Sequence, residues 1–387
     1  MRNISLVIFL LVSVAAFAQP PLGSRSMIHT QSARTFDSGR LEVHSNMNFF
    51  TRATEFIGSG QAPSNFHAVN YWLVAGNLAI TYGILDNLDF TIAPRVYQDT
   101  HYKNEYNLPG DIFMSLKLGS FAFMRRHFYG GLMANVRLGT GEVHNYPFTE
   151  YASGATEYGF TGALSYFLDP YLPDRSFNAH LNLGWWNHNE AGKPVFKFEA
   201  PYGSHQVGDE LIATKNSMEF QYAFGLVYPT AMFNYNLEFY GISYITEPDE
   251  FVYSRENYMY LTPSIRYKAF SWVSMDLGID IRLSKDENTT QGVPNKTPER
   301  LNLPNYAAWR VHMGLNITLL PFTATKKTPA QVEREQFNKR VEFFQKIVQE
   351  REKAEDVQQE LDRLKEERQE AEKELEELKQ ILEEQNQ

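Results

Sequence analysis

The chain has 387 residues, contains no cysteine and carries a formal net charge of -10. The lack of cysteine excludes a disulfide framework, a cysteine metal site and a lipid-anchored cysteine, and the acidic charge gives no sign of nucleic-acid binding. Aromatic residues make up 14% of the chain although its mean hydropathy is only -0.41. This combination favours a β-barrel, which places apolar side chains at every second position, over a bundle of membrane helices.

The first 18 residues contain the three parts of a secretory signal peptide. Arg2 supplies the basic start, an apolar run extends from Leu6 to Phe17, and Ala16-Phe17-Ala18 is a small-x-small cleavage pattern. The apolar run is too short to span a bilayer comfortably as an uncleaved anchor. We therefore predict secretion, with a mature chain that begins at Gln19.

Residues 19–38 form a polar lead-in, which we expect to lie in the periplasm, and alternating strands follow it. Successive side chains of a strand point to opposite faces, as Met218 and Phe220 do against Glu219 and Gln221. Twelve segments show this alternation, at about residues 41–49, 77–84, 88–96, 111–121, 127–139, 157–168, 175–187, 216–228, 232–244, 257–268, 272–284 and 305–320.

The connections between these segments are alternately short and long. Asp86-Asn87 is a tight hairpin turn, whereas residues 188–215 and 285–304 are long and polar. Short periplasmic turns and long external loops are typical of outer-membrane barrels, and an even strand number puts both barrel ends on the periplasmic side. The sequence therefore predicts an all-β, transmembrane, antiparallel barrel of twelve strands over residues 39–322.

A soluble β-sandwich or ligand-binding barrel would also alternate, but its apolar face would point inward. The signal peptide, the charges on the polar face and the aromatic residues at strand ends favour the membrane barrel. The residues expected to form an interfacial aromatic girdle are Tyr158, Tyr166, Trp185, Tyr228, Tyr267 and Trp309. Pro94 and Pro263 lie inside strands, where each removes a ladder hydrogen bond, so we expect local bulges and leave the strand limits there open.

The polar face carries acids and bases in nearly equal number, so it shows no ring of one sign that would give strong ion selectivity. Arg266 and Asp276 are expected to pair across a tight hairpin. The candidate lumen-lining residues are Glu42, His44, Asp89, Arg95, Asp111, Lys117, Arg137, His180, Glu219, Glu238, Arg266, Asp276, Asp280, Arg282, Arg310 and His312. Five inward aromatic residues predict a constricted interior, with the 188–215 loop folded into its mouth: Phe113, Tyr129, Phe167, Trp186 and Tyr240.

Catalysis and metal binding have weaker support. A lipolytic barrel needs a Ser–His pair, oriented by Asn or Asp, on the lipid side, whereas His44, His180 and His312 lie on the inward face. Glu42, His44 and His312 could approach one another because the first and last strands must be neighbours, yet histidines in a polar lumen usually only hydrogen-bond. We therefore predict no enzyme activity, no cofactor and no metal.

A helical tail follows a linker at residues 323–332. Thr328-Pro329-Ala330-Gln331 is a capping-box pattern, and residues 333–387 hold 18 acidic and 11 basic side chains, which leaves the rest of the chain at -3. Apolar residues at heptad spacing predict a periplasmic α-helical coiled coil over 333–387, on the order of 80 Å long, whose partner is a second copy or a periplasmic protein. The expected core positions are Leu361, Leu364, Ala371, Leu375, Leu378 and Leu382.

The signal peptide, the amphipathic strands and the last strand, Trp309–Phe322, resemble those of bacterial outer-membrane β-barrel proteins over about residues 1–322. Residues 317–322 resemble the terminal signal read by the barrel-assembly machinery, although Pro321 departs from it. A barrel followed by a periplasmic extension resembles the layout of OmpA-like proteins, but the tail has no folded peptidoglycan-binding domain. The resemblance implies an outer-membrane location, in contact with lipid.

Two functions are compatible with these features. One is a narrow passive channel for small polar solutes, and the other is a structural or assembly protein whose barrel anchors the coiled coil. We favour the channel, because unbroken polar inner faces exceed what an anchor requires.

Overall fold

The computed structural model describes most of the chain in seven stretches: residues 23–54, 69–100, 110–141, 148–198, 204–290, 305–321 and 329–385. The predicted signal peptide, and the linker as far as Thr328, lie outside the described residues. The chain divides into two compact units, Met1–Lys326 and Lys327–Gln387, and each is described by itself.

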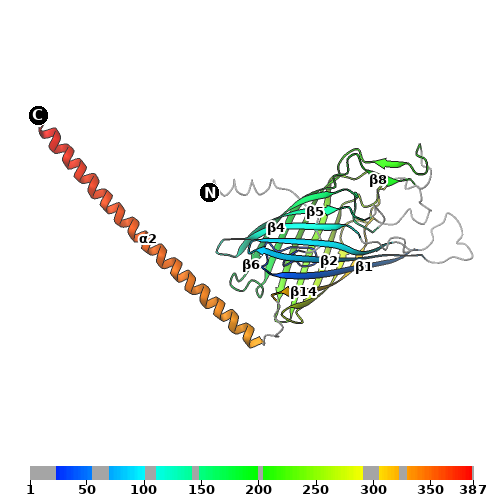
Figure 1. The fold of residues 1–387 in the computed structure, drawn as a ribbon, viewed down its shortest axis with the longest axis horizontal. Coiled ribbons are helices and arrows are strands. Elements are labelled where there is room, and N and C mark those ends of the chain that lie inside the picture. Colours follow the sequence, from blue (N-terminus) through cyan, green and yellow to red (C-terminus); the bar gives the residue numbers. More distant parts are fainter. Residues whose placement is uncertain are drawn as a thin grey trace, which may run out of the picture. The chain divides into compact units, whose positions relative to one another are not determined.

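Twelve antiparallel strands close into a barrel in the first unit, which confirms the predicted antiparallel barrel and its strand number (Figure 1). The barrel closes where the first strand pairs with the last, and Leu41 lies opposite Leu320. Asp86-Asn87 marks the turn end of the barrel, and the opposite end, which carries the long connections, is the loop end. The barrel strands are β1 (Leu41–Thr54), β2 (Val69–Leu85), β3 (Leu88–Thr100), β4 (Ile112–Phe123), β5 (Phe128–Leu138), β6 (Glu157–Phe167), β7 (Asn178–Asn187), β10 (Met218–Pro229), β11 (Phe233–Thr246), β12 (Tyr258–Tyr267), β13 (Val273–Arg282) and β14 (Trp309–Leu320).

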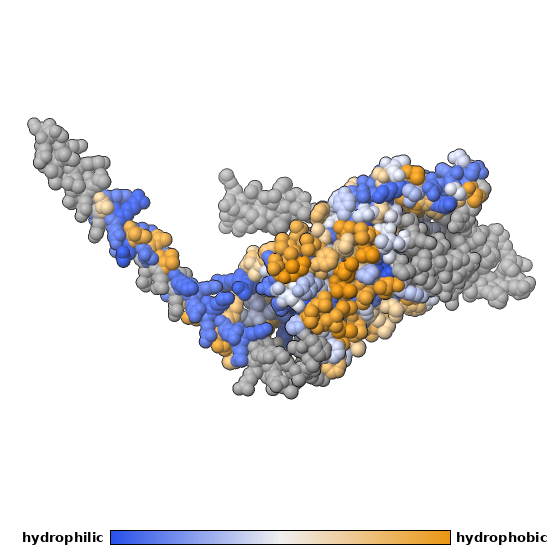
Figure 2. All heavy atoms as spheres, viewed as in Figure 1, coloured by the Kyte–Doolittle hydropathy of each residue, from blue (hydrophilic) through white to orange (hydrophobic). Residues whose placement is uncertain are grey.

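The two faces of the barrel wall differ in polarity as the alternation predicts. On β13, Leu277 is 58% exposed on the outside, whereas Asp276 and Asp280 are buried on the inside. Figure 2 shows apolar residues gathered over the strands on the outer surface of the barrel. A soluble barrel would have the opposite arrangement, so the predicted membrane-facing polarity agrees with the structure.

The expected girdle residues divide between the two ends of the barrel wall. Tyr158, Trp185 and Trp309 lie at strand positions next to the loop end, and the rings of Tyr158 and Trp185 are 5.8 Å apart. Tyr166, Tyr228 and Tyr267 occupy the corresponding positions next to the turn end.

The two strand prolines behave differently. Next to Pro94, the β2–β3 pairing shifts register between Gly76 and Asn77, which is the kind of irregularity that was expected. At Pro263 the β12–β13 register is the same on both sides, and only the pairs formed by Thr262 and Pro263 are missing. The expected bulge is therefore absent there. The two strands accommodate Pro263 by losing two residue pairs locally, and neither strand gains an extra residue.

The predicted lead-in differs most from the structure. Residues 23–36, here called the N-terminal hairpin, lie inside the barrel and contact inward side chains of β3, β4, β6, β7, β11, β12 and β13. Ser26 and Gln31 form an antiparallel bridge, and the amide of Met27 donates to the carbonyl of Thr30 at 2.9 Å. The hairpin thus turns at residues 27–30.

Inward glycines leave room for this hairpin. A Cβ atom at Gly119 would lie 2.4 Å from the carbonyl oxygen of Ala33, and one at Gly83 would lie 2.5 Å from that of Asp37. Backbone atoms could not approach the wall so closely at any residue with a side chain. Alternation in the strands carries no information about a segment that lies inside the barrel. The sequence pattern therefore did not predict the position of the N-terminal hairpin.

The loop end is built from short structured segments. β8 (Pro194–Lys197) and β9 (Glu210–Ile212) form a separate two-stranded sheet within the predicted 188–215 loop. Val195 of β8 packs with Tyr151, Ala213 and Val252 in a buried cluster. The start of the same loop, His188, is almost fully buried, so part of this loop does enter the mouth of the barrel.

The second unit is a single helix, α2 (Pro329–Gln385), which begins at the proline that the sequence places in its first turn. Exposed ion pairs four residues apart run along it, such as Arg351–Glu355 and Arg363–Glu367. Leu361 and Leu364 are 45% and 57% exposed in this single chain. No described helix combines the length and apolar character needed to cross a membrane.

Candidate functional site

The structure places every candidate lumen residue on the inner side of the barrel wall. Four of them are half-buried, namely Glu42, Arg95, Arg266 and Arg282, and the others are buried. They do not form one cluster. Instead they form separate groups that hold the N-terminal hairpin, join neighbouring strands or line a cavity at the loop end.

Acidic side chains of the wall bind the backbone of the N-terminal hairpin. Glu238 accepts hydrogen bonds from the amides of Ile28, His29 and Thr30 at 3.0, 2.8 and 2.6 Å. Asp89 accepts from the amide of Phe36 at 3.0 Å. These carboxylates satisfy amides that a turn leaves without backbone partners, in a buried place where an unsatisfied amide would be costly.

Basic side chains bind carbonyl groups of the same hairpin. Lys117 donates to the carbonyl oxygen of Ser24 at 3.0 Å, and Arg266 donates to that of Ser26 at 2.9 Å. Arg266 also forms the predicted cross-strand pair with Asp276, at 2.6 Å between Nε and Oδ1 and 2.9 Å between Nη2 and Oδ2. The hairpin thus offers donors to acidic side chains of the wall and acceptors to basic ones.

One group has the composition of a hydrolase triad. Nδ1 of His180 lies 2.7 Å from Oγ of Ser165, and its Nε2 lies 2.8 Å from Oδ1 of Asn178. However, Ser165 has no exposed surface, and its Oγ accepts a hydrogen bond from the amide of Ala33 at 2.7 Å. A nucleophile needs access to a substrate carbonyl, so this group serves to hold the hairpin.

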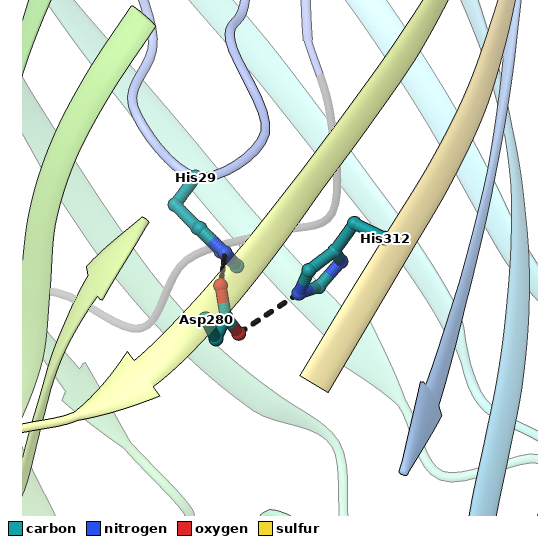
Figure 3. A group of neighbouring side chains, drawn as sticks. All are labelled: His29, Asp280 and His312. Atoms are coloured by element: carbon teal, nitrogen blue, oxygen red, sulfur yellow. Dashed lines mark hydrogen bonds and ion pairs between the residues drawn. The ribbon is translucent and has the colours of Figure 1, made fainter. Parts of the chain in front are cut away.

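A second group, drawn in Figure 3, has the composition of a metal site. Asp280 lies between two imidazoles, 2.9 Å from Nε2 of His29 and 2.8 Å from Nε2 of His312. The carboxylate also accepts from Thr262, from Tyr240 and from Nε of Arg310, the last at 3.0 Å from Oδ2. The guanidinium of Arg310 contacts the same Asp280 oxygen as His312, and its positive charge would repel a divalent cation. We therefore interpret the group as a set of hydrogen bonds that joins the hairpin to the wall.

The alternative set for a metal, Glu42, His44 and His312, is not brought together. Glu42 pairs with Arg40 at 2.8 Å, and His44 lies 3.5 Å from Asp276. Each residue therefore has its own partner at a different place on the wall.

A network of buried charged side chains lies at the loop end of the barrel. Arg137 pairs with Asp111 at 2.6 Å and with Glu157 at 3.5 Å. His188 lies between Glu157 and Glu219, at 3.0 and 2.7 Å. Burial alone would lower the pKa of His188, but the carboxylates of Glu157 and Glu219 outweigh burial and raise the pKa to about 10. His188 is therefore a cation at neutral pH.

Between the tip of the hairpin and this network lies a cavity of about 110 Å³. Ile28 and His29 of the hairpin form part of its lining, and Glu150 reaches it from the described stretch between β5 and β6. About 10–15 Å³ of such space holds one water molecule, so the cavity has room for several waters or for one small molecule. The lining combines arginine, histidine and acidic side chains with aromatic rings.

Sequence reasoning did not find several members of these groups. His29 and Ser24 were missed because the lead-in has no alternation, and Glu150 and His188 because they lie outside the strands. Glu157 was accessible to prediction, since it shares the odd-numbered inward face of β6 with Thr161 and Ser165.

Neither a known protein family model nor a curated protein matches this chain. Among solved structures, the NanC porin aligns with 72% of this chain and all of its own, at 10% identity and a TM-score of 0.43. An outer membrane channel from Pseudomonas putida F1 aligns over 74% of this chain and 98% of its own, at 8% identity and 0.42. A FadL homologue of Pseudomonas aeruginosa aligns over 79% and 94%, at 10% identity and 0.36. These likenesses are too distant to assign the chain to a family.

Proposed function

We propose that the chain is an outer-membrane β-barrel that forms a narrow passive channel for small polar solutes. The observation that carries the proposal is the polar cavity of about 110 Å³ inside a closed barrel. A barrel that served only as an anchor would gain more stability from an interior packed with apolar side chains than from buried charges.

The outer surface supports the proposed location. Exposed side chains on the strands are apolar, aromatic residues stand near both ends, and the sequence begins with a secretory signal pattern. In this proposal lipid surrounds the barrel, the turn end faces the periplasm, and α2 (Pro329–Gln385) lies in the periplasm. Solute size is limited by the N-terminal hairpin, which occupies part of the bore.

Conductance across a planar lipid bilayer tests the channel. We expect the purified full chain to give discrete steps of small conductance, and a chain without residues 325–387 to give the same steps. Heat-denatured protein is the control for leakage through damaged lipid. Absence of steps from both folded chains would contradict a channel.

A second candidate function is supported by α2. This helix has 57 residues, and its described surface exposes apolar side chains that include Phe344, Leu361 and Leu364. A solitary helix stabilised by charged side chains alone would not require these apolar residues. We propose that this face associates with a second copy of α2, or with a periplasmic protein, as a coiled coil. The barrel would then also anchor an assembly.

Chemical cross-linking of the chain in membranes tests this role. We expect a dimer or higher species that disappears when Leu361 and Leu364 are both replaced by Glu. Gln358→Glu, at an exposed position of the same helix, is the matched control for added charge. A cross-linking pattern that is the same for both variants would overturn self-association.

A further inference from the structure

Glu150 holds an unusual position among the acids of the barrel. Its side chain is 48% exposed, yet it lies between Arg95 of β3 and Arg310 of β14, because the surface that it exposes faces the internal cavity. Its neighbours Thr149 and Tyr151 are buried. The carboxylate thus enters the cavity from a connecting segment and not from the wall.

The ion pairs of Glu150 are long. Its carboxylate oxygens lie 3.6 Å from Nη2 of Arg95 and 3.9 Å from Nη1 of Arg310. By contrast, Asp111 lies 2.6 Å from Arg137. Charge-assisted hydrogen bonds are strongest at about 2.7–2.9 Å, so Glu150 is held more loosely than Asp111.

The arginines also have contacts that do not involve Glu150. Nε of Arg310 is fixed by Asp280 at 3.0 Å, and its guanidinium carbon lies 4.9 Å from the ring centre of Tyr260. The guanidinium carbons of Arg95 and Arg137 lie 5.5 and 5.3 Å from the ring centre of Phe113. These contacts preorganise cationic groups around the cavity.

The electrostatic environment favours a carboxylate at the place of Glu150. Burial raises the pKa of Glu150, but Arg95, Arg310 and Arg137 outweigh burial, so that its pKa is lowered. An exchange of this carboxylate for that of a ligand would leave the charge of the site unchanged. Such an exchange avoids the cost of leaving arginines without a partner.

Aromatic rings provide a surface for the rest of a ligand. Trp186, Tyr240, Tyr258 and Phe113 all contribute to the cavity lining. Tyr240 stacks on the imidazole of His29 at 3.7 Å, and on Tyr260 at 5.4 Å, so its ring is held rigidly. Rigid rings next to fixed cations are suited to a small molecule that has an acid group on a flat or apolar body.

We propose that this cavity binds small organic monocarboxylates with an aromatic or apolar body, and that Glu150 occupies the carboxylate position when no ligand is present. The proposal deepens the proposed channel function, because it names the class of solute that the interior selects. Arg95 and Arg310 bind the carboxylate of the ligand, and Glu150 competes with it.

Isothermal titration calorimetry of the full chain in detergent tests this site, with benzoate as the anionic probe and benzamide as its neutral counterpart. We expect the native chain to bind benzoate more tightly than benzamide. Glu150→Gln should bind benzoate about tenfold more tightly than the native chain, because the competing charge is gone. Arg95→Gln should weaken benzoate binding by a similar factor, and neither variant should change the binding of benzamide.

Glu247→Gln is the matched control, because Glu247 is an exposed acid paired with Arg255 outside the cavity. Equal binding of benzoate and benzamide, no detectable binding of either, or no gain in Glu150→Gln would each overturn the proposal. If Glu150→Gln does not fold, the comparison of probes on the native chain and on Arg95→Gln decides the question. Binding in detergent requires no permeation, so a chain that conducts ions without binding benzoate would contradict this inference and leave the channel intact.

Discussion

The backbone amide of His29 donates a hydrogen bond of 2.8 Å to the carboxylate of Glu238, a buried residue of β11. The amides of Ile28 and Thr30 donate to the same carboxylate. One side chain therefore binds the whole turn of the N-terminal hairpin, deep inside the barrel. Removal of this carboxylate is the most specific way to loosen the hairpin.

We expect Glu238→Ala to lower the free energy of unfolding by about 3 kcal/mol, because three amides inside the barrel lose their acceptor. We also expect trypsin to cleave after Arg25 and Arg34, which are largely shielded in the intact hairpin. Unfolding in urea and limited digestion measure the two effects. Glu247→Ala is the exposed control, and an unchanged digestion pattern in Glu238→Ala would argue against the anchoring role.

Gly119 tests the close contact between hairpin and wall. A Cβ atom there would lie 2.4 Å from the carbonyl oxygen of Ala33, whereas one at Gly162, on the outer face of β6, would meet its nearest atom at 3.8 Å. We expect Gly119→Ala to destabilise the barrel by about 1–3 kcal/mol and to expose the hairpin to protease. Gly162→Ala should be close to neutral. Equal losses of unfolding free energy in both variants would mean that replacing a strand glycine, and not the contact with the hairpin, causes the destabilisation.

The pair formed by Arg266 and Asp276 can be tested by a double-mutant cycle. Because both side chains are largely buried and joined by two hydrogen bonds, Asp276→Asn should cost about 3–5 kcal/mol of unfolding free energy. Arg266→Gln in the Asp276→Asn background should cost much less than Arg266→Gln alone. Strictly additive losses would show that the two residues act independently.

His188 should make stability depend on pH. Its pKa in the folded chain, about 10, exceeds the ordinary value of 6.5, so protonation stabilises the fold. This contribution is complete below about pH 6.5 and is lost as pH rises through about 10, at about 1.4 kcal/mol per pH unit between these values. His188→Gln should reduce this slope, measured by urea unfolding from about pH 7 to about pH 9. An equal slope in both chains would contradict the assignment.

Much of the fold could be predicted from the sequence, because a strand in a barrel wall has one lipid-facing and one inward side and therefore a period of two. The Arg266–Asp276 pair followed from the same register. The hairpin around His29 could not be predicted, because it has no periodicity and is held by contacts between residues as far apart as His29 and Asp280. The cavity depends on Glu150, whose position is set by a connecting segment and not by a strand.

The central claim is that a polar passage exists inside the barrel and that the N-terminal hairpin limits it. Single-channel conductance of the full chain and of a chain lacking residues 23–36 tests this claim most directly. We predict small steps for the full chain and steps several-fold larger without the hairpin, since the wall behind it is polar. Steps of equal size in the two chains, or no steps in either, would contradict the account.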